Sequence, residues 1–188
     1  MNTPGPRASR LPSALRRGAL AMAVAAALSG CASLREPGVD ALAGRLSVRV
    51  ESASGEPARS LSAGFELLGD AERGSLNLAT PLGTVLAQAR WSPGQVLLVT
   101  PQGRTPYADL AALTRDLLGE PLPVAALFDW LRGRPWPGAA SSASQAPDEA
   151  GFVQLGWQVT LARFDDGFIA ARRAGPPEVT VRAKLDRP

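Results

Sequence analysis

The sequence predicts a mainly β domain: a strongly curved antiparallel sheet with two helices inserted near the middle of the chain. Three observations support this prediction. Apolar and polar residues alternate with a period of two in two blocks, which is typical of half-buried strands. Two segments with helical apolar spacing lie between the blocks. Short clusters of Gly, Pro and Asp separate the alternating runs, as hairpin turns require.

The first block of alternation predicts five strands. In its first run Leu46, Val48 and Val50 alternate with charged and polar residues, and the later runs repeat the pattern. The five runs cover residues 45–50, 61–67, 75–78, 84–91 and 95–100. Turn residues at Gly69-Asp70 and Ser92-Pro93-Gly94 indicate antiparallel hairpins between neighbouring runs.

The second block predicts three more strands, near the C-terminus. These runs cover residues 157–161, 168–173 and 179–185, with a hairpin turn expected at Asp165-Asp166-Gly167. The stretch 135–149 between the blocks is rich in Pro, Ser, Ala and Gly and has no periodicity. It is therefore expected to be a mobile surface loop.

Two helices are predicted between the blocks. Asp109 can cap the first, in which Leu110, Leu113 and Leu117 share a face and which Gly119 ends. Pro123 opens the second, which Gly133 ends; its apolar residues recur at helical spacing at Val124, Leu127, Phe128 and Leu131. Such helices can cover the concave apolar face of a curved sheet. If they fill the concavity, the domain is structural; if they only plug it, a cavity remains for an apolar ligand.

The N-terminus has the layout of a secretory signal. Arg7, Arg10, Arg16 and Arg17 precede an apolar run over residues 18–28, and no acidic residue occurs before Glu36. The apolar run is far shorter than the roughly twenty residues that cross a bilayer. It leads to Leu28-Ser29-Gly30-Cys31, which resembles a lipobox.

Cys31 is the only cysteine of the chain, so it has no internal disulfide partner. We therefore expect cleavage before Cys31 and attachment of an S-diacylglycerol and an N-acyl group to it. The predicted organisation is a cleaved signal peptide over 1–30, the lipidated cysteine with a short tether over 31–43, and a single domain over 44–188.

Charge and composition exclude several function classes. Cleavage removes four arginines and leaves 16 basic against 17 acidic residues, so basicity gives no reason to expect nucleic-acid binding. The chain has no histidine, which excludes Ser-His-Asp and Cys-His catalysis and a histidine-ligated zinc site. The acidic pairs Asp148-Glu149 and Asp165-Asp166 lie in polar, turn-like stretches and are interpreted as solvated loop charges. Neither an enzyme nor a metal or other cofactor is expected.

At the level of motifs, the chain resembles the LolB family of outer-membrane lipoprotein receptors. The matching fragments occur in the family's order behind the lipobox: Gly44-Arg45-Leu46, Phe65, the run 76–86 with Thr80-Pro81-Leu82-Gly83 at its centre, Gly119-Glu120-Pro121-Leu122-Pro123, Trp130-Leu131-Arg132-Gly133-Arg134-Pro135, and Gly156-Trp157-Gln158-Val159. The resemblance covers residues 44 to about 185.

The resemblance implies an incomplete, strongly curved antiparallel β-barrel with a helical plug over an apolar cavity that takes acyl chains. Twelve residues are expected to line this cavity: Leu46, Val48, Phe65, Leu67, Leu76, Leu78, Trp91, Leu127, Trp130, Trp157, Val159 and Val181. The implied partners are a LolA-type periplasmic carrier, the acyl chains of cargo lipoproteins and outer-membrane phospholipid, and the protein is expected to be a monomer. Ala32 and Ser33 follow the cysteine without an aspartate retention signal, which by analogy implies sorting to the periplasmic face of the outer membrane.

Pro81, Leu82 and Gly83 form the expected membrane-insertion loop. Thr80-Pro81-Leu82-Gly83 suits a type I turn, with Pro at the second and Gly at the fourth position, which leaves Leu82 exposed at the tip. The resemblance implies that this leucine serves delivery into the membrane. Folding of Leu82 back onto the rim of the sheet is the alternative.

Two other functions remain open from the sequence. The first is a structural or assembly lipoprotein whose helices fill the fold completely and leave no cavity. The second, which has less support, is a lipid-anchored hydrolase that uses carboxylates.

Overall fold

The computed structural model describes residues 41–53, 55–144 and 150–186. The chain divides into two units, residues 1–38 and 39–188, and every described residue belongs to the second unit. The predicted signal peptide and Cys31 therefore lie outside the described residues, as do Asp148 and Glu149.

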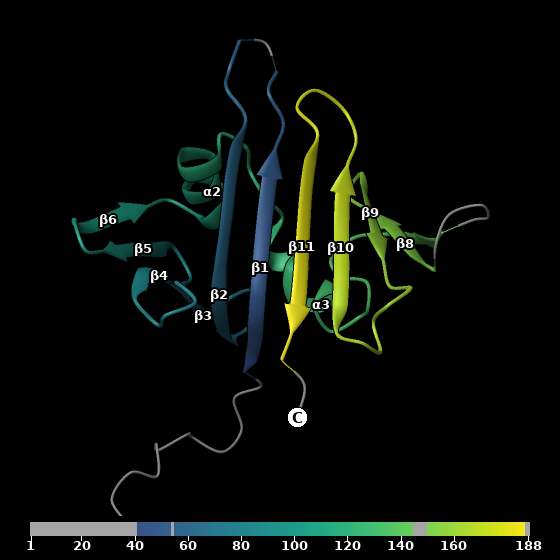
Figure 1. Cartoon of the computed structure of the whole chain (residues 1–188), viewed down its shortest axis with the longest axis horizontal. Helices are drawn as coiled ribbons and strands as arrows, with labels where there is room; N and C mark the ends of the chain where they lie inside the picture. The colour runs from purple at the N-terminus through teal and green to yellow at the C-terminus, as the bar shows by residue number, and fades with distance from the viewer. Residues whose placement is uncertain (1–40, 54, 145–149, 187–188) are drawn as a thin grey trace, which may run out of the picture. The chain divides into compact units, whose positions relative to one another are not determined.

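The described residues form an open, eleven-stranded antiparallel sheet with two short helices (Figure 1). The strands are β1 (Leu42–Val50), β2 (Arg59–Gly69), β3 (Gly74–Ala79), β4 (Val85–Ser92), β5 (Gln95–Thr100), β6 (Gly103–Tyr107), β7 (Ser141–Ala143), β8 (Gly151–Gln154), β9 (Trp157–Thr160), β10 (Phe168–Arg173) and β11 (Val179–Leu185). Their order across the sheet is β6-β5-β4-β3-β2-β1-β11-β10-β9-β8-β7. The first and last strands of this order are edges, so the sheet does not close.

The two predicted blocks of strands meet at the centre of the sheet, where β1 pairs with β11. Val48 lies opposite Val181 in this ladder, and both side chains are buried. Leu61 on β2 lies opposite Val48 on its other side. The period-two alternation thus aligns across strands that are far apart in sequence and gives the sheet one apolar face.

Gly44 shows why the contact between β1 and β11 needs a small residue at one point. A Cβ atom at this position would collide with the backbone carbonyl oxygen of Lys184 on β11. Glycine therefore permits the two backbones to approach each other here.

The helices α2 (Leu110–Leu118) and α3 (Val124–Trp130) lie behind the four central strands in Figure 1. The Asp109 side chain caps α2 and accepts a hydrogen bond from the Ala112 backbone N–H at 2.7 Å, as predicted. Gly119 ends α2 in the left-handed conformation with φ of 80°. The Leu122 backbone N–H donates to the Thr114 hydroxyl at 2.9 Å, which ties the segment before α3 back to α2.

Three strands were not predicted from the sequence: β6, β7 and β8. β6 has the sequence Gly-Arg-Thr-Pro-Tyr and is exposed over most of its length, so it carries no apolar alternation. β7 lies inside the stretch 135–149 that was expected to be a loop, and that expectation is wrong for residues 141–143. Residues 145–149 of the stretch lie outside the described residues. Both β6 and β7 are mostly exposed edge strands. An exposed strand does not need a buried apolar face, so its sequence need not alternate.

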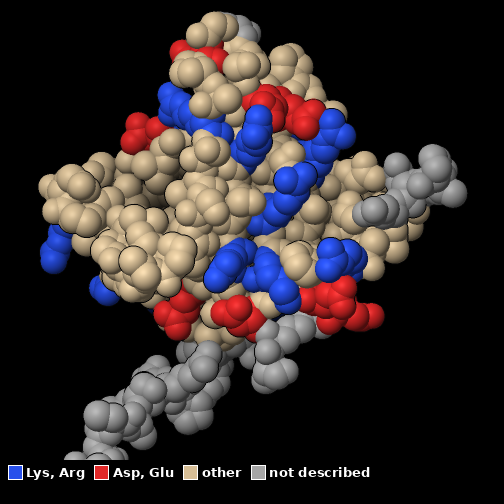
Figure 2. Space-filling view, viewed as in Figure 1, with Lys and Arg blue, Asp and Glu red and all other residues tan. Residues whose placement is uncertain are grey.

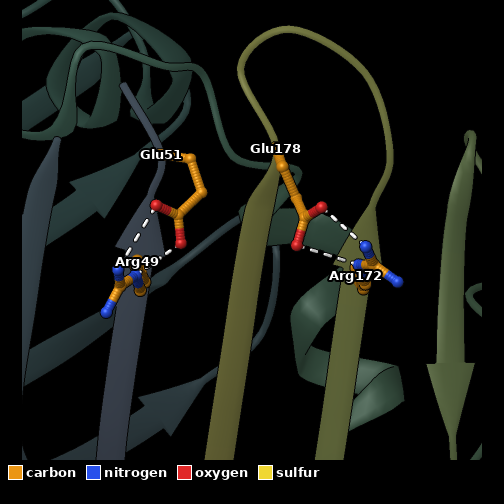
Figure 3. Close-up of polar contacts among 4 residues, drawn as sticks. All are labelled: Arg49, Glu51, Arg172 and Glu178. Atoms are coloured by element: carbon orange, nitrogen blue, oxygen red, sulfur yellow. Dashed lines mark hydrogen bonds and ion pairs between the residues drawn. The ribbon is translucent and has the colours of Figure 1, made fainter. Parts of the chain in front are cut away.

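The two faces of the sheet differ in chemistry. Basic side chains cross the face seen in Figure 2, with acidic side chains toward both ends of the strands. Arg45 on β1 and Arg182 on β11 are exposed, and neither makes an ion pair with another described residue. Arg49 pairs with Glu51, and Arg172 pairs with Glu178, each through two hydrogen bonds (Figure 3). The helices and the apolar side chains lie on the other face.

Candidate functional site

An apolar pocket lies between the sheet and the two helices. Its free volume is about 120 Å³. Nineteen residues line it: Leu46, Val48, Leu61, Phe65, Leu67, Leu76, Leu78, Ala87, Ala89, Leu98, Leu113, Thr114, Leu117, Leu118, Leu122, Val124, Leu127, Leu131 and Val181. They come from the five strands β1 to β5, from β11, from both helices and the segment between them, and from Leu131 directly after α3.

The pocket offers a ligand no free polar group among its lining side chains. Thr114 is the one residue of the lining with a polar side chain. Its hydroxyl already donates to the Ala111 carbonyl oxygen at 3.2 Å and accepts from the Leu122 N–H. Binding here would therefore depend on the burial of apolar surface and on shape, with no fixed hydrogen bond to orient a head group.

Eight of the twelve predicted cavity residues line this pocket: Leu46, Val48, Phe65, Leu67, Leu76, Leu78, Leu127 and Val181. The structure thus brings together residues from β1, β2, β3, β11 and α3. Their contact with acyl chains stays a prediction.

The other four predicted residues, Trp91, Trp130, Trp157 and Val159, lie in the packed core and not in the pocket lining. The Trp91 ring packs edge-on against Phe128 with ring centroids 5.6 Å apart, and its indole N–H donates to the Asp70 carbonyl oxygen at 2.9 Å. The Trp130 ring lies 6.0 Å from that of Trp157. Apolar periodicity predicts which face of a helix or strand points inward. It does not predict whether that face meets the pocket or the packed core, and for this reason four of the twelve residues lie outside the pocket lining.

Several pocket residues were not singled out from the sequence, although their pattern contains the signal. Leu61 has the same parity as Phe65 and Leu67 on β2, and Leu98 is an inward residue of β5. Leu113 and Leu117 share the predicted apolar face of α2. Leu118 is the last residue of α2 and fits the same helical face, whereas Leu122 carried no such signal, because it lies in the segment between the helices.

The pocket is narrow in this structure. Sites for small ligands usually enclose about 300 to 1,000 Å³, so 120 Å³ is too little for a long acyl chain. An acyl chain of this length fits only if the pocket enlarges, either by movement of α2 and α3 away from the sheet or by a decrease in the curvature of the sheet. Leu117 lines the pocket and is also exposed, so the free space approaches the surface beside the end of α2.

A few polar contacts hold the helices to the sheet. Arg173 on β10 forms an ion pair with Glu120, just after α2, at 2.8 Å. The Tyr107 hydroxyl on β6 donates to the Asp116 carboxylate at 2.6 Å, and this hydrogen bond raises the pKa of Tyr107 above its ordinary value of 10.0. Partly exposed contacts of this kind are individually weak, typically about 1 kcal/mol or less, so the buried apolar side chains of the helices contribute more to their attachment.

The segment 80–83 forms a tight turn between β3 and β4. The Gly83 N–H donates to the Thr80 carbonyl oxygen at 2.9 Å, and Gly83 has a positive φ of 84°. The Thr84 N–H donates to the Thr80 hydroxyl at 3.1 Å, which adds a second closure of the turn. Leu82 is 95% exposed, so its side chain does not fold back onto the sheet.

Among the described residues, the remaining sequence candidates give no catalytic arrangement. Asp165 and Asp166 are exposed, and Asp166 pairs with Arg163 at 3.2 Å. Over the described ranges no three metal-ligating side chains come together. Neither α2 nor α3, the helices of the described part, has the length and apolar character needed to cross a bilayer.

Comparison with known proteins decides the family. The family model described as outer membrane lipoprotein LolB matches residues 41–186. The chain belongs to the LolB family. The match covers all eleven strands and both helices, so the pocket and the turn at Leu82 lie within the LolB region.

Proteins named outer-membrane lipoprotein LolB are similar over most of their length. The one from Bordetella petrii is 34% identical over 186 residues, which is 92% of this chain and 93% of the relative. The one from Ralstonia nicotianae is 36% identical over 194 residues, or 91% and 87% of the two chains. The one from Chromobacterium violaceum is 29% identical over 161 residues, or 80% and 84%. The assignment to the LolB family thus rests on the whole described domain.

Proposed function

We propose that this chain is a lipid-anchored receptor on the periplasmic face of the outer membrane. In this proposal it accepts acylated lipoproteins from a LolA-type carrier and inserts them into the inner leaflet. The observation that carries the proposal is the wholly apolar pocket under α2 and α3, in a chain of the LolB family. The names of the relatives support the location at the outer membrane.

The physical reason for such a receptor is the insolubility of the cargo. Burying one methylene group is worth about 0.8 kcal/mol, so three chains of roughly sixteen carbons would cost tens of kcal/mol to leave in water. The chains must therefore pass from one apolar interior to another and then to a bilayer. No bond is made or broken in this transfer, so it needs no catalytic side chain.

Lipidation of Cys31 is part of the proposal. Two or more acyl chains give stable attachment to a bilayer, whereas a single chain gives only reversible binding. The tether from Ala32 to the start of β1 is short, at about 3.5 Å per residue for extended chain, so it would hold the domain within about 40 Å of the membrane. Leu82 at the exposed turn is then within reach of the bilayer, and we assign it the insertion step.

The small volume of the pocket favours one other function, a structural or assembly lipoprotein with a filled core. Binding of a fluorescent fatty-acid analogue separates the two functions. The receptor should bind the analogue saturably and release it when unlabelled palmitate is added. A protein with a filled core should show neither saturation nor displacement, and that result would rule out the receptor function.

A further inference from the structure

The outer face of the sheet, opposite the pocket, carries a group of cations at its centre. Leu46 and Val181 line the pocket, so by alternation their neighbours Arg45 and Arg182 point to the outer face. Both arginines are exposed, and neither forms an ion pair with another described residue. Lys184 lies on the same face, directly opposite Arg45 in the ladder between β1 and β11. Three cationic side chains therefore gather at the junction of the two central strands.

This group has an excess of positive charge. Arg45 and Lys184 face each other across the ladder, and like charges in this position destabilise a sheet. Arg182 lies diagonally from Arg45, where residues are typically about 7 to 8 Å apart. The Lys184 ammonium donates to the Asp166 carbonyl oxygen, but a carbonyl group brings no negative charge. An anion between the two guanidinium groups would relieve the repulsion, and the planar guanidinium group matches the geometry of phosphate oxygens.

Other arginines of the outer face already have acidic partners. Arg49 pairs with Glu51, and Arg172 pairs with Glu178 (Figure 3). Figure 2 shows basic side chains across the middle of this face and acidic side chains toward both ends of the strands. An external anion is therefore attracted most strongly to the middle of the face.

An exposed aromatic ring extends the same row of side chains. Phe168 on β10 lies opposite Lys184 in the next ladder and is 37% exposed. The Lys184 ammonium lies 4.9 Å from the centroid of this ring, and the Arg163 guanidinium lies 4.2 Å from it. Cations combined with an exposed aromatic ring are typical of protein surfaces that contact the head-group layer of a bilayer.

The tether joins the sheet beside this surface. β1 begins at Leu42, three residues before Arg45. At about 3.5 Å per residue, an acylated Cys31 would hold the start of β1 within about 40 Å of the bilayer. Such attachment keeps the local concentration of lipid head groups high, so a few charged contacts are enough for binding. A lipid surface is therefore favoured over a soluble acidic protein as the partner of these cations.

We propose that Arg45, Arg182 and Lys184 form a binding surface for the phosphate groups of anionic phospholipid, with Phe168 at its border. This inference rests on the proposed lipid anchor at Cys31. The contact orients the domain on the bilayer, with the outer face of the sheet toward the head groups. The opposite side, which holds α2, α3 and the pocket, then stays free to meet the carrier.

The test uses the double variant Arg45→Gln/Arg182→Gln and a matched control, Arg104→Gln/Arg115→Gln. Arg104 on the edge strand β6 and Arg115 on α2 are exposed, and neither has an ion pair with another described residue. Both double variants remove two positive charges. All proteins are made as the mature chain with Cys31→Ala, so that binding to liposomes reports the domain and not the acyl anchor.

Each protein is sedimented with liposomes of phosphatidylethanolamine and phosphatidylcholine, with and without phosphatidylglycerol. The parent should bind only liposomes that contain phosphatidylglycerol, and about 1 M salt should abolish this binding, because the Debye length is then about 3 Å. The variant at Arg45 and Arg182 should bind at least about ten-fold more weakly, because each cation near an anionic bilayer contributes roughly five-fold. The control should bind within about two-fold of the parent.

Two further measurements show whether the variants are otherwise intact. Circular dichroism should be the same for all of the proteins. Saturable binding of a fluorescent fatty-acid analogue should also be unchanged, because none of the four substituted arginines lines the pocket. If the variant at Arg45 and Arg182 does not fold, Arg182→Gln and Arg115→Gln give the same comparison, with an expected difference of about five-fold.

Parental liposome binding by the variant at Arg45 and Arg182 would overturn the proposed surface. If that variant instead takes up cargo from the carrier more slowly, the arginines belong to a contact with the carrier. Equal weakening in the control would also overturn the surface, as would a parent that does not bind phosphatidylglycerol liposomes. A parent that binds these liposomes but not the fatty-acid analogue would overturn the receptor function and leave the lipid-binding surface in place.

Discussion

Trp130 and Gln154 form a hydrogen bond inside the protein, with the indole N–H of Trp130 donating to Oε1 of Gln154 at 2.8 Å. Both side chains are almost completely buried. Oε1 also accepts from the Trp136 N–H at 2.9 Å, while Nε2 donates to the carbonyl oxygens of Trp136 and Ala139 at 2.7 and 2.8 Å. All four hydrogen-bonding positions of this amide are therefore used.

Replacing Gln154 by leucine should lower the free energy of unfolding by about 2 to 4 kcal/mol. The change leaves the Trp130 indole N–H and three backbone groups without their partner, and unpaired buried polar groups are costly. Urea denaturation followed by circular dichroism measures the effect. Gln158→Leu on the neighbouring strand, where the side chain is only half-buried, is the matched control and should change stability by less than about 1 kcal/mol. Equal effects of the two changes would contradict the role of the amide.

Filling the pocket should block binding of acyl chains without harming the fold. Ala89→Leu adds three carbon atoms beside a free space of 120 Å³, so its stability should stay within about 1 kcal/mol of the parent. Saturable binding of a fluorescent fatty-acid analogue should weaken at least about ten-fold. Ala171→Leu, at a buried alanine outside the pocket lining, should instead destabilise the protein by about 1 to 3 kcal/mol. Undiminished fatty-acid binding by Ala89→Leu would place the ligand elsewhere.

Leu82→Glu should separate binding from delivery. Because Leu82 is exposed at the turn, the change should alter stability by less than about 0.5 kcal/mol and leave fatty-acid binding intact. Transfer of a labelled lipoprotein to liposomes should fall sharply, since a carboxylate costs up to a few kcal/mol to move into a bilayer. Leu155→Glu at the β8–β9 turn is the control and should transfer normally. Parental transfer by Leu82→Glu would show that Leu82 has no part in delivery.

Acid should remove the contribution of the Arg172–Glu178 pair (Figure 3). The hydrogen bond from Arg172 lowers the pKa of Glu178 below its ordinary value of 4.5. The pair therefore stabilises the folded state above about pH 4.5, and this contribution is lost as the pH falls through the lower folded-state pKa. Arg172→Gln should raise the pKa of Glu178 toward 4.5 in an NMR titration of its carboxyl group. Arg182→Gln, on the adjacent strand, should leave that pKa unchanged; an equal rise would point to a general field effect.

Replacing Cys31 by alanine behind a signal peptide that is cleaved without lipidation should release a folded domain from the membrane. In the proposed function the domain is attached through the acyl groups of Cys31. Fractionation of cells that express the variant measures this, with Ser33→Ala in the tether as the control. Recovery of the Cys31 variant in the integral membrane fraction would contradict the lipoprotein assignment.

Most strands of the sheet could be predicted from the sequence, but its two edge strands could not. Alternation predicted β1 and β11 without showing that they would pair, yet the apolar residues Val48 and Val181 meet across that ladder. β6 and β7 carried no signal, because an exposed edge strand needs no apolar alternation. Their positions depend on hydrogen bonds to β5 and β8, which no local pattern records.

The candidate site was predictable to a similar degree. Residues such as Phe65 and Leu127 were placed correctly on inward faces, and they meet in one pocket. Trp130 was assigned to the same cavity, but it packs against Gln154 and Trp157 and does not line the pocket. Leu127 and Trp130 both point inward from the seven-residue helix α3. Only the tertiary arrangement decides which of the two side chains lines the pocket.

Because β6 and β7 are edge strands, the sheet is open and is not a closed barrel. The diameter of a closed barrel is fixed by the number of strands and by their stagger, so the size of its interior is fixed as well. An open sheet can change its curvature through small changes of twist between neighbouring strands, while the hydrogen bonds between the strands persist. In the proposed function, such relaxation would let the same interior take up lipid chains that differ in number and length.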